Sequence, residues 1–119
     1  MIEYKKLLKP EKSVLEFLSR IHLEMPVLWM SDYTFSEEEL TEQINDFTEK
    51  FEKNLLLIFM ATEKGEITGF IINEIKPEQP ETLHIISLWT APAYRGKGVA
   101  KTLKIMTEAE CKKRAIKEQ

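Results

Sequence analysis

Apolar residues follow two different periodicities along this chain. Three stretches carry apolar residues three and four positions apart, as amphipathic helices do: residues 11–24, 36–52 and 98–119. Three others are continuous apolar runs of strand length: residues 55–62, 67–75 and 82–90. Residues 2–8 form a weaker strand candidate. The pattern predicts the order β-α-α-β-β-β-α, a mostly antiparallel sheet flanked by helices in an α/β (α+β) fold.

Turn and cap signals set the boundaries of these elements. Pro26 ends the first helix, and "SEEE" from Ser36 to Glu39 is a capping box that begins the second. "EKGE" between the second and third strands predicts a tight hairpin turn with Gly65 at a positive φ. No linker or repeat interrupts the chain, so residues 1–119 are predicted to form a single domain.

Composition excludes several classes of protein. The chain is 43% hydrophobic and 31% charged, and its net charge of −3 disfavours a general nucleic-acid binder. One cysteine permits no intramolecular disulfide, which fits a reducing compartment. The N-terminus has no secretion signal, and the longest apolar run is too short to cross a bilayer. We therefore expect a cytoplasmic protein without a membrane or nucleic-acid partner and without a metal site.

A turn between the last strand and the last helix carries two of the four glycines. The segment reads "APAYRGKGVAKTLKIM" and combines these glycines with nearby cations. The first N–H groups of a helix have no partner within the helix, and the helix dipole adds partial positive charge there. Glycine also lets the backbone approach a ligand closely. The turn therefore predicts a phosphate site.

Two common phosphate motifs fit this turn poorly. A P-loop needs glycine immediately before its Lys-Thr pair, but Ala100 precedes Lys101-Thr102 here. A dinucleotide-binding turn needs a third glycine where Lys101 stands, and no βαβ unit follows. An unrelated phosphate or nucleotide binder remains an alternative reading of the same turn.

The turn resembles the pyrophosphate-binding motif of the GNAT superfamily of acyl-CoA-dependent N-acetyltransferases. That motif, [QR]-x-x-G-x-[GA], is matched by Arg95-Gly96-Lys97-Gly98-Val99-Ala100. The lead-in "LWTAPAYRGKG", the hairpin with "GEITGF" and the order of elements are similar to the family as well. The resemblance implies an enzyme that transfers an acetyl group from acetyl-CoA to a primary amine. It also implies residues that bind the coenzyme A moiety: Leu88, Trp89 and Thr90 along the pantetheine arm, and Arg95, Gly96, Lys97, Gly98, Val99, Ala100 and Lys101 around the pyrophosphate.

Acetyl transfer to an amine needs a base that removes the proton of the amine. The resemblance implies His84, on the strand leading to the motif, as the base. A histidine satisfied by a neighbouring side chain is the competing interpretation. Glu74 on the adjacent strand is the second candidate, against a solvated hairpin carboxylate. By analogy with the family, Trp29, Asp32 and Tyr33 are candidates for binding the acceptor, although aromatic residues there also suit a core.

The chain departs from the family pattern after its last helix. Family members continue with a strand, a helix and a final strand, and one of these elements often supplies a tyrosine acid. Their absence leaves three readings open: a compact enzyme completed by a homodimer, a truncated inactive acetyltransferase, or a non-catalytic acyl-CoA-binding or regulatory module. A bare sheet edge favours association, so a homodimer is expected. The sequence does not distinguish whether the acceptor amine belongs to a small molecule, a peptide or a protein.

Overall fold

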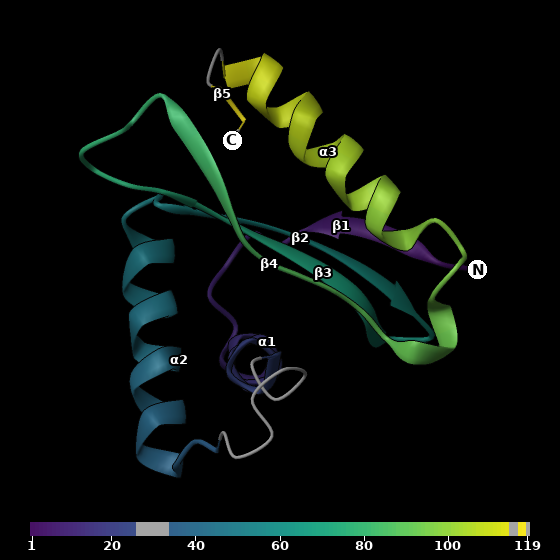
Figure 1. The fold of residues 1–119 in the computed structure, drawn as a ribbon, viewed down its shortest axis with the longest axis horizontal. Helices are drawn as coiled ribbons and strands as arrows, with labels where there is room; N and C mark the ends of the chain where they lie inside the picture. Colours follow the sequence, from purple (N-terminus) through teal and green to yellow (C-terminus); the bar gives the residue numbers. More distant parts are fainter. Residues whose placement is uncertain (26–33, 115–116, 119) are drawn as a thin grey trace. The chain divides into compact units, whose positions relative to one another are not determined.

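In the computed structural model, which describes residues 1–25, 34–114 and 117–118, the apolar runs become strands of one sheet. The strands are β1 (Glu3–Lys6), β2 (Leu56–Glu63), β3 (Glu66–Ile75), β4 (Thr82–Thr90) and β5 (Lys117–Glu118). The helices are α1 (Lys12–Glu24), α2 (Glu37–Glu52) and α3 (Val99–Arg114), with a short 3-10 helix, η2 (Pro92–Tyr94), after β4. The predicted order of strands and α-helices is confirmed up to α3, and the structure adds η2 and β5 (Figure 1).

The chain divides into two units, which are described one at a time. One unit combines Met1–Leu8 with Leu55–Gln119 and contains the whole sheet and α3. The other is Lys9–Asn54 and contains α1 and α2.

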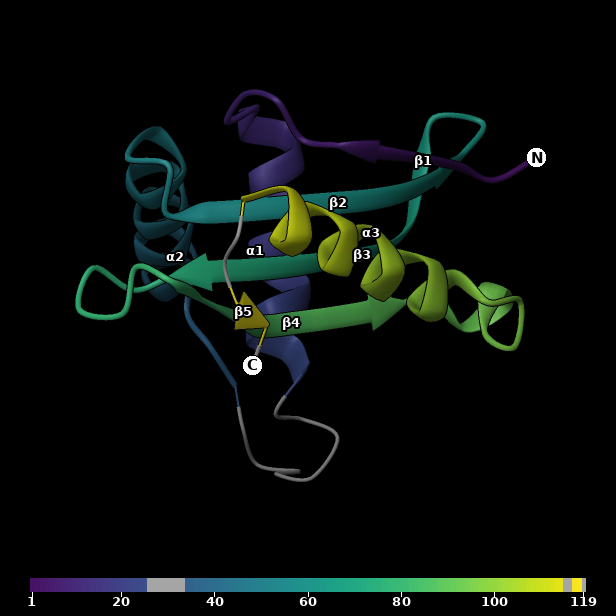
Figure 2. The same ribbon diagram turned by 90° about the horizontal axis from the view of Figure 1, so that it is seen from above.

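The sheet has the strand order β1-β2-β3-β4-β5. Its first four strands are antiparallel neighbours, as predicted, and Figure 2 shows them side by side beneath α3. β5 is parallel to β4 and pairs only with its first two residues, Thr82 and Leu83. The turn between β2 and β3 has Lys64 at φ 54° and Gly65 at φ 81°, which confirms the predicted tight hairpin.

α3 packs on one face of the sheet. Its buried residues are Val99, Leu103, Thr107 and Cys111. Val99, Leu103 and Cys111 pack with strand residues of the same core, namely Leu57, Phe59, Ala61, Ile71 and Leu83. Leu103 is fully buried, and burying a side chain of this size contributes about 1.5–3 kcal/mol.

The buried stripe of α3 departs from simple apolar spacing in its C-terminal half. Apolar spacing predicts Met106 and Ala109 in the stripe, but Ala109 is exposed and Thr107 is buried instead. The Asn73 side-chain amide on β3 donates to Thr107 Oγ1 at 3.2 Å, so a polar residue occupies the core position with its hydroxyl satisfied. Cys111 is 4% exposed and is a small residue of the same core.

The opposite face of β2 and β3 is buried as well. Alternate residues Ile58, Met60, Phe70 and Ile72 are at most 3% exposed. Strands that bury both faces read as continuous apolar runs rather than as an alternating pattern, which explains the sequence of β2.

The α1–α2 unit begins its second helix as predicted. Glu39 N–H donates to Ser36 Oγ at 3.1 Å, and Ser36 N–H donates back to the Glu39 carboxylate at 3.3 Å. The His22 ring lies against Phe47 with 5.5 Å between ring centroids, and burial lowers the pKa of His22. None of the helices in the described ranges combines the length and hydropathy that a membrane crossing needs.

Candidate functional site

The glycine turn joins the end of β4 to the start of α3 through η2. Gly96 has φ +80° and Gly98 has φ +79°, a region that side chains with a Cβ rarely adopt. A Cβ at either position would meet no protein atom within 4 Å. The glycines are therefore needed for the path of the backbone, and the space in front of them is open.

The turn ends in unpaired helix donors. The first backbone bond of α3 runs from Thr102 N–H to the Gly98 carbonyl at 3.0 Å. The N–H groups of Val99, Ala100 and Lys101 thus have no acceptor within the helix. Donors of this kind, at the positive end of the helix dipole, attract an anion.

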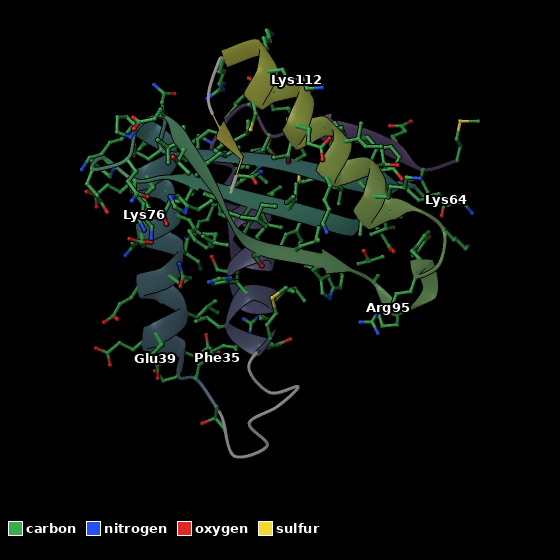
Figure 3. The ribbon with its side chains drawn as sticks, turned by 45° about the horizontal axis from the view of Figure 1, so that its top comes forward. Phe35, Glu39, Lys64, Lys76, Arg95 and Lys112 are labelled. Atoms are coloured by element: carbon green, nitrogen blue, oxygen red, sulfur yellow. The ribbon has the colours of Figure 1, made fainter. Side chains whose placement is uncertain are left out.

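Three exposed cations surround these donors, and two of them have internal contacts. Arg95 Nε–H donates to the Thr90 carbonyl at 3.3 Å, and Lys97 Nζ lies 5.1 Å from the centroid of the Tyr94 ring. Lys101 is exposed on the first turn of α3. Figure 3 shows Arg95 at the end of the sheet where Lys64 lies, while Lys76 lies at the other end.

Tyr94 ties the turn to the β2–β3 hairpin. Its hydroxyl donates to Glu63 Oε2 at 2.5 Å. This bond, helped by the Met1 amino group, holds the pKa of the Glu63 carboxyl below its ordinary value. The same bond raises the pKa of Tyr94. A carboxylate and a neutral phenol are thus the stable forms of this pair.

The outer edge of β4 lies next to the turn. β5 reaches only Thr82 and Leu83, and along the described part of the chain no other strand pairs with that edge. Leu88, Trp89 and Thr90, the predicted pantetheine-binding residues, form the last part of this edge. The Trp89 ring packs on Phe70 at 5.5 Å between centroids, so its side chain has a structural role.

A β-bulge separates the two halves of β4. Ser87 pairs with Ile72 and Ile85 pairs with Asn73, so Ile86 has no Cα partner on β3. A bulge disrupts the ladder and redirects the backbone groups beside it. The residues on either side therefore present their N–H and C=O groups differently from those of a regular strand.

His84 and Glu74, the two predicted bases, are brought together by the sheet register. They are directly opposite each other on β4 and β3, and both are half-buried. Opposite residues share one face with Cβ atoms about 5 Å apart. His84 Nε2 and Gln79 Oε1 lie 3.0 Å apart. When Nε2–H donates to this amide oxygen, Nδ1 of the neutral ring keeps a lone pair that can accept a proton.

His84 lies six residues before Thr90, about 20 Å along the strand. The predicted base and the predicted phosphate turn are thus at opposite ends of β4. A ligand that binds both must lie along the strand and past the bulge.

Three predicted acceptor residues, Trp29, Asp32 and Tyr33, lie outside the described residues. Within the described ranges, no group of three or more His, Cys, Asp or Glu residues has the arrangement of a metal site.

The sequence pattern does not identify Glu63 as a site residue, and Tyr94 stands in it only as part of the lead-in motif. Tyr94 stands next to the motif residue Arg95, which is a usable signal. Glu63 gives none, because its partner is 31 residues away.

The sequence matches the family model described as the acetyltransferase (GNAT) family over residues 18–118. No curated protein sequence matches the chain.

Solved structures share its fold. A Staphylococcus aureus protein described as a GNAT family acetyltransferase superposes with a TM-score of 0.85 at 21% identity, covering 95% of this chain and 93% of the other. A Clostridium acetobutylicum acetyltransferase with acetyl-CoA superposes with a TM-score of 0.77 at 21% identity, covering 100% of this chain and 79% of the other. PaiA N-acetyltransferase of Thermoplasma acidophilum, in complex with coenzyme A, superposes with a TM-score of 0.66 at 24% identity, covering 98% of this chain and 75% of the other. With the family match over most of its length, this chain belongs to the GNAT acetyltransferase family.

Proposed function

We propose that this protein is an N-acetyltransferase that transfers an acetyl group from acetyl-CoA to a primary amine. The observation that carries the proposal is the turn before α3, where two glycines at positive φ lead into unpaired helix N–H groups among exposed cations. Family membership and neighbours that bind acetyl-CoA or coenzyme A support the same ligand.

The turn fits the pyrophosphate of coenzyme A. The backbone of residues 95–101 offers several N–H donors, and the open space at Gly96 and Gly98 lets an anion approach the main chain. The edge of β4 at Leu88–Thr90 offers backbone groups to the amides of the pantetheine arm, much as a sheet edge accepts a peptide. Acetyl-CoA supplies an acetyl group that is activated as a thioester. The amine nitrogen bonds to the acetyl carbon, the carbon–sulfur bond breaks, and coenzyme A leaves as a thiolate that takes up a proton from solvent.

The residues of β4 supply two further functions in this proposal. His84 Nδ1 accepts the proton that the amine loses, because the contact with Gln79 fixes the other ring nitrogen. Glu74, opposite His84 on the neighbouring strand β3, is the second candidate in this proposal: it accepts that proton in place of His84 or holds the amine as a cation beforehand. A backbone N–H of β4 beside the bulge polarises the carbonyl under attack.

The acceptor is proposed only as a class. A primary amine has a proton that the proposed base, His84, can accept. Trp29, Asp32 and Tyr33 stay predictions for binding the amine. The predicted homodimer, single domain and cytoplasmic location likewise stay predictions.

Titration calorimetry with acetyl-CoA, and with ATP as control, tests the proposal. We expect saturable binding of acetyl-CoA and much weaker binding of ATP, since only the former has a pantetheine arm for the β4 edge. Equal affinity for both ligands would indicate a general phosphate site. Absence of acetyl-CoA binding would refute the cofactor assignment, and binding without turnover of any amine would favour a non-catalytic acyl-CoA-binding module.

A further inference from the structure

The start of α3 lies very close to β3 because residue 69 has no side chain. Gly69 is buried, and its φ lies outside the left-handed region, so space rather than conformation requires glycine here. A Cβ on Gly69 would lie 2.7 Å from Val99 Cγ1 and 3.0 Å from the Trp89 carbonyl oxygen. Both distances are shorter than ordinary van der Waals contact, so a methyl group would displace one of these neighbours.

Val99 has little freedom to avoid such a group. It is the first residue of α3, is 1% exposed, and is β-branched, which restricts its side chain to essentially one rotamer in a helix. The Trp89 oxygen belongs to the backbone of β4. A larger residue 69 would therefore move the first turn of α3 or the end of β4, the two elements that the glycine turn joins.

The same hairpin also holds the other side of the turn. The Tyr94 hydroxyl, one residue before Arg95, donates to Glu63 on β2. Ala91 N–H, just after β4, donates to the Thr68 carbonyl on β3 at 2.8 Å. The glycine turn thus lies between two points, Tyr94 and Val99, that the β2–β3 hairpin positions.

We propose that Gly69 and the Glu63–Tyr94 hydrogen bond are positioning elements that set the anion-binding turn for its ligand. The inference rests on the proposed function, since the ligand is the pyrophosphate of acetyl-CoA. Residues of the hairpin make no contact with the ligand in this proposal. They hold the N–H groups of residues 96–101 in the arrangement that converges on one anion, and displacements of about 0.5 Å are enough to weaken such a site.

Two ligands separate this role from a general structural one. Acetyl-CoA contains the pyrophosphate, whereas acetyl-pantetheine has the same thioester arm without it. We expect Gly69→Ala to weaken acetyl-CoA binding roughly tenfold and Tyr94→Phe about threefold. Tyr94→Phe should leave the affinity for acetyl-pantetheine unchanged, measured by calorimetry at high ligand concentration. Gly69→Ala should weaken acetyl-pantetheine binding less than acetyl-CoA binding, because its Cβ also presses on the Trp89 carbonyl in the proposed pantetheine-binding edge. Glu63→Gln should resemble Tyr94→Phe, because it weakens the same hydrogen bond.

Gly65→Ala is the matched control. Gly65 is in the turn of the same hairpin, and its positive φ makes alanine unfavourable, yet a Cβ there touches nothing. It should lower the melting temperature while leaving both affinities unchanged. Tyr94→Phe keeps the test decisive should Gly69→Ala fail to fold.

The outcomes separate failure of the positioning role from failure of the proposed function. Unchanged acetyl-CoA affinity in Tyr94→Phe and Glu63→Gln, or equal losses for both ligands, would overturn the positioning role. A wild-type protein that binds no acetyl-CoA would instead refute the proposed function, and this inference with it. A loss confined to acetyl-CoA in Tyr94→Phe and Glu63→Gln supports both.

Discussion

The two ends of β4 differ in the groups that form the candidate site: backbone groups at one end and side chains at the other. At the end near Thr90, the site is made of backbone: glycines at positive φ and the unpaired N–H groups of a helix. At the end near Thr82, it is made of side chains: His84 and Glu74 face each other across two strands. The bulge at Ile86 lies between them.

The difference teaches how affinity and chemistry can be separated on one strand. A backbone site tolerates many side chains but requires a particular main-chain path, so glycine substitutions are its sensitive changes. A side-chain site depends on register, because a one-residue shift moves every side chain to the other face of the sheet. Changes at one end should therefore affect binding, and changes at the other should affect turnover.

The largest expected effect is at the backbone end. Gly98→Glu places a carboxylate at the proposed phosphate position, where like charges cost several kcal/mol, or more than about a hundredfold in affinity. Calorimetry with acetyl-CoA measures the loss. Gly65→Glu is the control, since it introduces the same charge and the same backbone strain at the β2–β3 turn, outside the proposed phosphate site. Similar acetyl-CoA affinities in Gly98→Glu and Gly65→Glu would contradict a phosphate site at the turn before α3.

The next effect is at the side-chain end. His84→Ala should lower kcat by about 10²- to 10⁴-fold while leaving acetyl-CoA affinity unchanged, because it removes the base and not the turn. Added imidazole should restore part of the rate. Glu74→Gln is the paired variant and should have a smaller effect. A wild-type kcat in His84→Ala would exclude His84 as the base, and a larger loss in Glu74→Gln would transfer the role to Glu74.

A smaller effect is expected from removing one exposed positive charge beside the glycine turn. Lys101→Gln should weaken acetyl-CoA binding by a factor of about two to five and reduce its salt dependence, because exposed charges act through screened attraction. Lys112→Gln, at the other end of α3 (Figure 3), should leave both unchanged. Affinities measured over a series of salt concentrations test this. A salt dependence identical in the two variants would remove Lys101 from the site.

The smallest effect concerns acid stability. The pKa of Glu63 is lowered in the folded protein, so the folded state binds this proton less readily than the unfolded chain. Its contribution to stability is fully present above the unfolded value near 4.5 and is lost as pH falls through the lowered folded value. Glu63→Gln should flatten the dependence of stability on pH in that window. Unfolding by urea at several acidic pH values measures it, with Glu66→Gln on the same hairpin as control.

Several features were predictable because their partners are close in sequence. The capping box of Ser36 and Glu39, the hairpin turn at Gly65 and the glycine turn at residues 96–98 each involve residues within a few positions of one another. Hydrophobic periodicity likewise predicts every element except η2 and β5. A strand of two residues leaves no periodic signal.

Other features depend on partners that are distant in sequence. Gly69 reads as an ordinary glycine in a strand until the structure brings Val99 against it, 30 positions later. Thr107 lies in the core of α3 in place of Ala109, and its hydroxyl is satisfied by Asn73, 34 positions earlier, which apolar spacing alone does not indicate. The pairing of His84 with Glu74 depends on the bulge at Ile86, which shifts the register between β3 and β4 by one residue.

By itself, the sequence determined the order of the main elements, the family resemblance and the turn that can bind an anion. These depend on local conformational preferences and on short motifs, which operate over one or two turns of chain. Only the tertiary structure decided which residues hold that turn and which side chains share a face with His84. Such contacts join strands and helices far apart in the sequence, and they form only when the sheet pairs and α3 packs on it.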